Sequence, residues 1–87
     1  MIALVGFPWG PAVQSIQRRF GSVLRKRREE AGLSQEALAA EAGLHRNYIG
    51  LLERGQRIPS ILVVKQIAKA LGTSMTDLIA EVERPSK

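Results

Sequence analysis

The chain contains no cysteine and only one histidine among its 87 residues. Without thiols it forms neither disulfides nor thiolate metal sites, and a single imidazole is too few for a zinc ligand cluster. Aromatic residues make up 5% of the sequence, whereas hydrophobic residues make up 45%. The core must therefore be built from leucine, isoleucine, valine and alanine, as in a bundle of packed helices. No metal or other cofactor is expected.

The sequence also lacks a long uninterrupted apolar run. The opening residues, MIALVGF, are apolar, but Pro8, Gly10 and Pro11 soon follow and no basic segment precedes them. This pattern fits neither a signal peptide nor a membrane span. We therefore expect a cytoplasmic protein that does not contact membranes. Its length suits one compact domain, with no second domain for binding a small-molecule effector.

Groups typical of catalysis are missing as well. The sequence has no set of histidine, acid and nucleophile and no glycine-rich phosphate loop, so we do not expect an enzyme. The net charge of +5 instead suits a polyanionic partner. Six of the thirteen basic residues lie in one short segment: Arg18, Arg19, Arg25, Lys26, Arg27 and Arg28. They form either a solvated helix face or a flank that faces DNA phosphates.

The most informative segment is LSQEALAAEAGLHRNYIGLLERG, residues 33–55. Ser34 is a favourable N-cap, and Gly43 can take the left-handed conformation that ends a helix. Between them Leu38, Ala39 and Ala42 recur at helical spacing. The pattern predicts one short helix that ends at Gly43.

A second short helix is predicted over about residues 45–54, again followed by a glycine, Gly55. Ile49 and Leu52 lie three residues apart and face inward. Two helices joined by so short a connection must cross steeply, as in the helix-turn-helix, where the second helix enters the major groove of DNA. The outward face of that second helix then carries Arg46, Asn47, Gly50 and Leu51.

Three further helices are predicted, which gives five in all. The first runs from about Val13 or Ser15 to Ala31, the fourth follows Ser60, and the fifth follows Ser74, which forms a capping box with Asp77. Their inward residues recur at spacings of three and four: Ile16, Phe20, Val23 and Leu24 in the first, Ile61, Val64, Ile67, Ala68 and Leu71 in the fourth, and Leu78 and Val82 in the fifth.

The motifs LSQEALA, YIGLLERG and KQIAKALG, together with Pro59, resemble the phage-repressor and Cro-like (XRE) helix-turn-helix regulators. The resemblance covers about residues 20–82, and the size also resembles the controller proteins of restriction-modification systems. It implies an all-α fold: a compact five-helix lambda-repressor-like DNA-binding domain, with the helix-turn-helix formed by helices 2 and 3. That domain would span residues 15–83, between an N-terminal arm or leader of residues 1–14 and a frayed tail of residues 84–87.

The resemblance also implies roles for individual residues. Contacts to DNA bases are expected from Gln35, Arg46, Asn47, Gly50 and Leu51. The chemistry agrees, because arginine can donate two hydrogen bonds to guanine and asparagine can pair with adenine in the same bidentate way. Leu51 departs from the usual polar residue of the family, so it either touches a thymine methyl group or is ordinary surface.

Contacts to DNA phosphates are expected from Ser34, His45, Tyr48, Arg54 and Arg57. Tyr48 has the alternative of packing over the junction of the two helices. His45 stands where the family usually has Ser, Thr or Asp, and we expect it to be a weak cap. A structural ion pair between Arg28 and Glu53 is also implied.

A homodimer is expected because a single short recognition helix contacts few base pairs, whereas two subunits can bind the half-sites of a palindromic operator. The predicted interface contains Leu62, Val63, Met75 and Ile79, whose other interpretation is a wider core. The predicted function is a sequence-specific transcriptional regulator that binds double-stranded DNA in a prokaryotic or phage nucleoid. The alternative is an antitoxin-like or bridging protein-interaction module.

Overall fold

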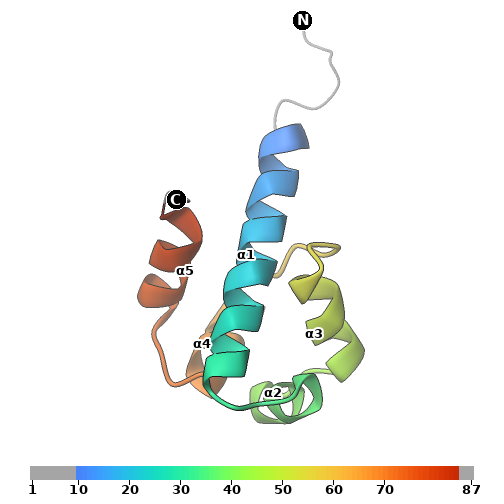
Figure 1. The fold of residues 1–87 in the computed structure, drawn as a ribbon, viewed down its shortest axis with the longest axis vertical. Helices are drawn as coiled ribbons and strands as arrows, with labels where there is room; N and C mark the ends of the chain where they lie inside the picture. The colour runs from blue at the N-terminus through green and yellow to red at the C-terminus, as the bar shows by residue number, and fades with distance from the viewer. Residues whose placement is uncertain (1–9, 85–87) are drawn as a thin grey trace, which may run out of the picture.

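Five helices and no strands make up the part of the chain that the structure describes, which confirms the predicted all-α fold (Figure 1). The structure is a computed structural model that describes the backbone of residues 10–84 and the side chains of residues 15–84. The helices are α1 (Gly10–Glu30), α2 (Gln35–Ala42), α3 (Arg46–Glu53), α4 (Ile61–Ala70) and α5 (Met75–Glu83). No helix of residues 10–84 is long and apolar enough to cross a membrane.

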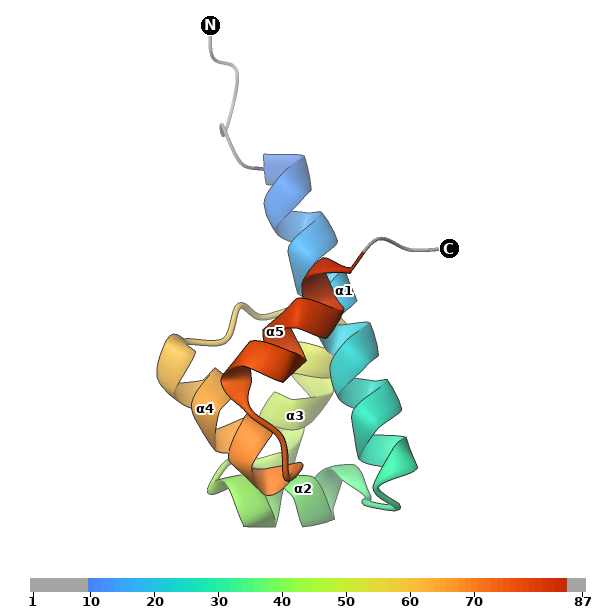
Figure 2. The ribbon, with the colours of Figure 1, turned by 90° about the vertical axis from the view of Figure 1, so that its left-hand side faces the viewer.

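The long helix α1 organises the other four. It packs against α3 on one side and against α5 on the other, while α2 lies across its C-terminal end and contacts α3 and α4 (Figures 1 and 2). α4 fills the space behind α1 and also packs against α5. This arrangement leaves one face of the α2–α3 pair at the surface.

Serine residues begin three of the helices, as the sequence predicts. The hydroxyl oxygens of Ser34, Ser60 and Ser74 each accept a hydrogen bond from the backbone N–H three residues further on, at 2.9, 3.1 and 3.0 Å. Each bond satisfies an N–H group that the first turn of a helix leaves without a partner. α2 ends where Gly43 adopts a left-handed φ of 71°, which favours glycine.

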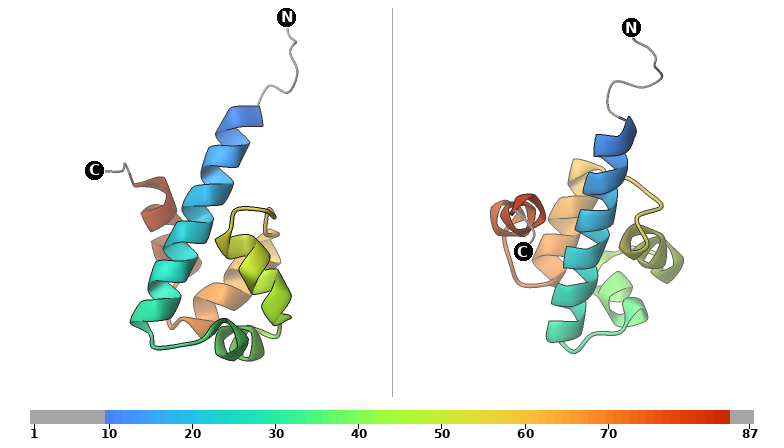
Figure 3. Two further views of the ribbon diagram at one scale, coloured as in Figure 1. Left: turned by 45° about the vertical axis from the view of Figure 1, so that its right-hand side comes forward. Right: turned by 45° about the horizontal axis from the view of Figure 1, so that its top comes forward.

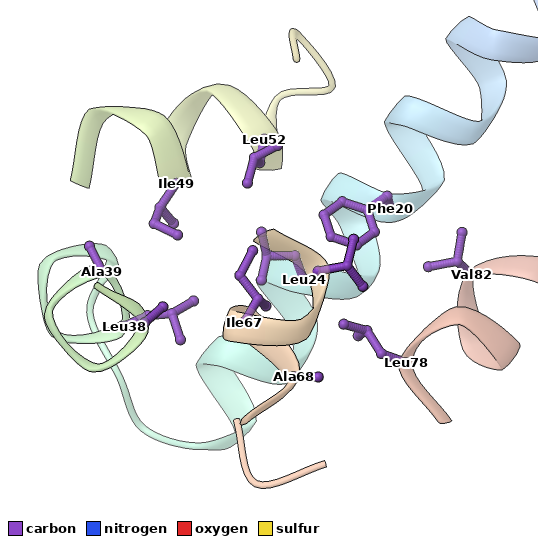
Figure 4. Packing of buried hydrophobic residues seen from close by; sticks show 12 residues of the cluster. Phe20, Leu24, Leu38, Ala39, Ile49, Leu52, Ile67, Ala68, Leu78 and Val82 are labelled. Atoms are coloured by element: carbon purple, nitrogen blue, oxygen red, sulfur yellow. The ribbon is translucent and has the colours of Figure 1, made fainter. Parts of the chain in front are cut away.

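The core contains twelve buried hydrophobic side chains from all five helices (Figure 4). The predicted inward residues lie in this core or pack against it, with two exceptions: Ile16 is 50% exposed and Ile61 is 78% exposed. Ile61 is the first residue of α4, and Ile16 lines an open apolar groove together with Ile58 and Ile79. Helical spacing identifies the apolar face but not how far the neighbouring helices reach along it.

α1 begins at Gly10, earlier than the predicted start at Val13 or Ser15. Pro11 therefore lies in the first turn, where the N–H that proline lacks would have no helical partner in any case. Residues 10–14 are thus helical rather than part of an arm. Residues 1–9, which we predict to form either a packed arm or a loose leader, lie outside the described residues. The division into arm, domain and tail stays a prediction.

α1 and α3 approach each other closely at Gly21, which is buried. A Cβ atom at this position would lie 2.4 Å from the carbonyl oxygen of Leu52 and 2.5 Å from that of Glu53. Both atoms belong to the backbone of α3, so they cannot move aside as the end of a flexible side chain would. Glycine at position 21 therefore sets how near the C-terminal end of α3 comes to α1.

α1 and α5 are joined by charged side chains. Glu81 accepts hydrogen bonds from Arg27 Nε at 2.7 Å and from Lys26 Nζ at 3.1 Å, and its side chain is 13% exposed. These hydrogen bonds lower the pKa of the Glu81 carboxyl below its ordinary value of 4.5. The bond from Arg27 has the larger effect and the bond from Lys26 the next largest. Arg19 adds a hydrogen bond to the backbone carbonyl of Arg84.

We expect the contacts of Glu81 to stabilise the fold only while its carboxyl is ionised. Because folding lowers the pKa, this stabilisation is complete above the unfolded value near 4.5 and is lost as the pH falls through the lower folded value. The Glu81→Gln variant should therefore melt below the wild type at about pH 7, and the gap should close toward about pH 3. Thermal unfolding followed by circular dichroism across this range measures the gap.

The matched control is Glu83→Gln, which removes an exposed carboxyl from the same helix. Its melting temperature should follow that of the wild type at each pH. A gap for Glu81→Gln that stays constant down to low pH would contradict a contribution from the ionised carboxylate.

Candidate nucleic-acid interface

α2 and α3 cross steeply at the surface of the domain. When α3 is seen from its side, α2 is seen almost along its axis (Figure 3, left). The connection consists of Gly43, Leu44 and His45. It stays short because Gly43 turns the chain in the left-handed conformation and the Leu44 N–H bonds back to the Ala39 carbonyl at 2.8 Å. This is the geometry that the sequence predicts for the pair.

His45 caps α3 with its ring, and the expectation that this cap is weak stays a prediction. The ring atom Nδ1 accepts a hydrogen bond from the Asn47 backbone N–H at 3.0 Å. An imidazole nitrogen can accept only when it carries no proton, so the proton of the neutral ring is on Nε2. We based the expectation on the preference for oxygen atoms at this position and overlooked the ring nitrogen as an acceptor.

A shallow hollow lies where α2 and α3 meet, and it contains the residues that the sequence predicts to contact bases. Arg46 and Asn47 are exposed at the start of α3, and Leu51 is half-buried one turn further on. The hollow also contains two of the five predicted phosphate contacts, whereas His45, Tyr48 and Arg57 are not part of its lining. The predicted residues that line it are Ser34, Gln35, Arg46, Asn47, Gly50, Leu51 and Arg54.

Sequence analysis did not predict two other residues that line the hollow, Arg28 and Glu36. Arg28 was predicted only as a structural partner, because its sequence position on α1 gives no sign that it reaches this surface. Glu36 follows Gln35 in the first turn of α2, where an acidic residue interacts favourably with the helix dipole. Its exposure beside the candidate base contacts is visible only once both helices are in place.

Gln35 is held by Glu53 rather than pointing freely outward. Its Nε2 donates a hydrogen bond to Glu53 Oε1 at 3.0 Å, and its side chain is half-buried. Tyr48 is also half-buried and packs against the hydrophobic core. The packing interpretation of Tyr48 is therefore supported, and the ring lies outside the hollow.

Arg28 and Glu53 form a bidentate pair that is almost fully covered. Arg28 Nε and Nη2 donate to the two carboxylate oxygens of Glu53 at 2.6 and 3.1 Å, and the two side chains are 11% and 4% exposed. Arg28 Nη1 also donates to the Leu33 carbonyl at 2.8 Å. The hydrogen bond to Glu53 raises the pKa of Arg28 above its ordinary value, against the effect of burial. Three segments, α1, the start of α2 and the end of α3, thus meet at one guanidinium.

Most of the basic residues of α1 are engaged within the domain. Arg25 pairs with Glu29 one turn along the helix at 3.1 Å, and the contacts of Lys26, Arg27 and Arg28 are described above. Arg18 packs beside Gly55 in the loop after α3. The idea of a phosphate-facing flank on α1 therefore loses support, and the interpretation as structural and solvated positions gains it.

Two short, steeply crossed helices with a polar outward face define a helix-turn-helix DNA-binding domain. The chain belongs to the helix-turn-helix family HTH_3, which matches residues 24–78. This confirms the resemblance to XRE-type regulators. Relatives of this chain are named HTH-type transcriptional regulators, and this chain is a DNA-binding regulator of that kind.

Restriction-modification controller proteins are among the most similar proteins. The chain is 36% identical to Control protein C.MunI from Mycoplasma sp over 73 residues. This alignment covers 83% of this chain and 99% of that protein. It is 42% identical over 66 residues to Control protein C.BamHI from Bacillus amyloliquefaciens, covering 75% and 82%. The crystal structure of the controller protein C.AhdI from Aeromonas hydrophila matches with a TM-score of 0.70 and 44% identity, covering 71% of this chain and 94% of that one.

We expect loss of either partner of the Arg28–Glu53 pair to unfold the domain rather than to remove a DNA contact. Each substitution, Arg28→Ala or Glu53→Ala, leaves a buried charge without its partner, which costs about 3–5 kcal/mol of unfolding free energy. Chemical denaturation measures this loss. The control is Arg25→Ala, which breaks the exposed pair with Glu29, in which the arginine side chain is 66% exposed. This substitution should lower the unfolding free energy by about 1 kcal/mol or less. Wild-type stability in either test variant would show that the pair contributes nothing.

Proposed function

We propose that the protein binds a palindromic operator as a homodimer, with α3 of each subunit in the major groove, and so regulates transcription by occupying the DNA. The observation that carries this proposal is the hollow of α2 and α3, which gathers the five residues predicted to contact bases at one surface. A recognition helix typically contacts base edges with its N-terminal residues. Arg46 and Asn47 occupy those positions in α3.

The chemistry of these two side chains supports sequence recognition. Arginine can donate two hydrogen bonds to guanine O6 and N7, and asparagine can donate to and accept from adenine, at about 1–3 kcal/mol of discrimination each. Arg57 lies exposed in the loop after α3, where a cation attracts phosphate without distinguishing sequence. Ser34 and His45 stand at the starts of α2 and α3 and are proposed as further phosphate contacts, because helix N-termini favour anions.

A second copy of the chain is proposed to cover an apolar surface on the side of α4 and α5. A groove there is lined by Ile16, Ile58, Ile79 and core residues, and two further exposed apolar residues, Ile61 and Leu62, begin α4. Ile58 is 64% exposed and Leu62 is 63% exposed, which is costly for side chains of this size in water. A two-fold dimer that buries this surface would present two recognition helices to the half-sites of one operator.

This surface differs in part from the interface predicted from sequence. Leu62 and Ile79 are exposed and remain in the proposed interface, whereas Val63 and Met75 are half-buried and pack against the core. The core thus accounts for the apolar character of Val63 and Met75. Ile16, Ile58 and Ile61 take their place as proposed contacts.

Selection of bound sequences from random duplex DNA tests sequence-specific recognition. Wild-type protein should enrich a palindromic motif, and the Arg46→Ala, Asn47→Ala double variant should lose the motif while keeping weak, salt-sensitive binding to any duplex. Both residues are exposed, so the double variant should melt with the wild type. If no motif is enriched by the wild type, the proposal fails and the fold serves a protein partner. A motif that the double variant also selects would assign recognition to other residues.

The homodimer is tested by sedimentation of a Leu62→Glu variant at micromolar concentration. A carboxylate at this position would be buried without a partner in the dimer but solvated in the monomer, so the variant should sediment as a monomer while the wild type sediments as a dimer. Lys69→Glu is the control, because it also places a carboxylate at an exposed position of α4, in the last turn and so at the opposite end of the helix from Leu62. A monomeric wild type, with or without DNA, would remove the homodimer from the proposal.

A further inference from the structure

Gly50 occupies an unusual place on α3. It lies in the middle of the helix, where glycine is less favourable than alanine, and it is buried although it is on the outward face. Arg46, Gly50 and Arg54 are spaced four residues apart, so they follow one another along a single stripe. A group other than the core must therefore cover Gly50.

The guanidinium of Arg54 is that group. A Cβ atom at position 50 would lie 3.1 Å from Arg54 Nη1, which is closer than ordinary van der Waals contact, and 3.7 Å from Gln35 Oε1. Side chains on a helix lean toward its N-terminus and cover the preceding turn. Because Gly50 has no side chain, Arg54 can lie flat across this turn. Its guanidinium then lies about 5 Å, one helical turn, nearer to Arg46 along the helix axis than the Cα atom of Arg54 does.

Among residues 15–84, one side chain accepts a hydrogen bond from Arg54, and this bond holds the base of the guanidinium. Nε donates to Gln56 Oε1 at 3.2 Å. This bond does not use the two terminal amino groups, which can donate to guanine O6 and N7 as a pair. Arg54 lines the same hollow as Arg46 and Asn47 and is exposed there.

We propose that Arg54 is a further base-contacting residue that recognises a guanine in the major groove, and that Gly50 is the positioning residue that admits its guanidinium to the recognition surface. This inference rests on the proposed sequence-specific DNA binding and replaces the assignment of Arg54 to phosphate. Gly50 then serves recognition through the side chain that lies over it, and not through its own closeness to DNA. Arg46 and Arg54 together specify two base pairs of each half-site.

Arginine-to-lysine substitution separates base recognition from phosphate binding. Lysine keeps the charge that attracts phosphate but cannot donate the planar pair of hydrogen bonds to guanine. The probe is the operator that the wild type selects from random duplex DNA, together with the set of its variants in which every base pair of one half-site is changed to each of the others. Dissociation constants are measured over this set for the wild type, Arg54→Lys and Gly50→Ala. Arg25→Lys, on α1 and paired with Glu29, is the matched control.

For Arg54→Lys we expect the preference for one G·C pair to fall by about tenfold or more, with the other positions unchanged and the salt dependence preserved. Gly50→Ala should lose the preference at the same base pair, because the added methyl group displaces the guanidinium. Its melting temperature should not fall, since alanine is the better helix former and the atom it meets is the end of a flexible side chain.

Two results would overturn the inference while leaving the proposed function intact. If Arg54→Lys alters affinity equally for every sequence, or not at all, Arg54 does not read a base. If Gly50→Ala keeps the preference that Arg54→Lys loses, Gly50 does not position the guanidinium. A wild type that selects no operator would overturn the proposed function itself, and this inference with it.

Discussion

The buried pair of Arg28 and Glu53 is the contact on which the recognition surface depends. It joins the last turn of α1 to the last turn of α3, and its third bond, to the Leu33 carbonyl, fixes the entry into α2. Gln35 adds a bond to the same carboxylate from the first turn of α2. One carboxylate therefore sets the relative positions of α1, α2 and α3, although the helices that carry the outward residues are only eight residues long.

The charges of the domain have two separate uses. Lys26, Arg27 and Arg28 of α1 hold helices together by pairing with Glu81 of α5 and Glu53 of α3. Arg46 and Arg54, in contrast, are exposed and line the hollow. The net charge of +5 by itself does not distinguish these uses. On the proposed function, attraction to DNA is concentrated at the helix-turn-helix, where it also sets the orientation of binding.

The sequence was sufficient for the helices and most of the core, because N-caps, glycine stops and apolar spacing are local signals. Ser34, Ser60 and Ser74 cap as predicted, and Leu38, Ile49 and Leu78 are fully buried. Contacts between two elements have no such local signal, and the Arg28–Glu53 pair was predicted only through the resemblance to known regulators.

Local spacing could not show that Ile16 lines an open groove, that the covering group over Gly50 is Arg54, or that Gly21 touches the backbone of α3. That the acceptor of the His45 cap is a ring nitrogen was missed for a different reason, since it requires a particular ring orientation.

The contact of Gly21 with the backbone of α3 also bears on how such a protein can change over generations. On the proposed function, mutation can exchange the outward side chains of α3, which are not part of the core, and so move the protein to new operators one residue at a time. Position 21 is closed to every residue with a side chain, so the frame that carries those changes stays the same.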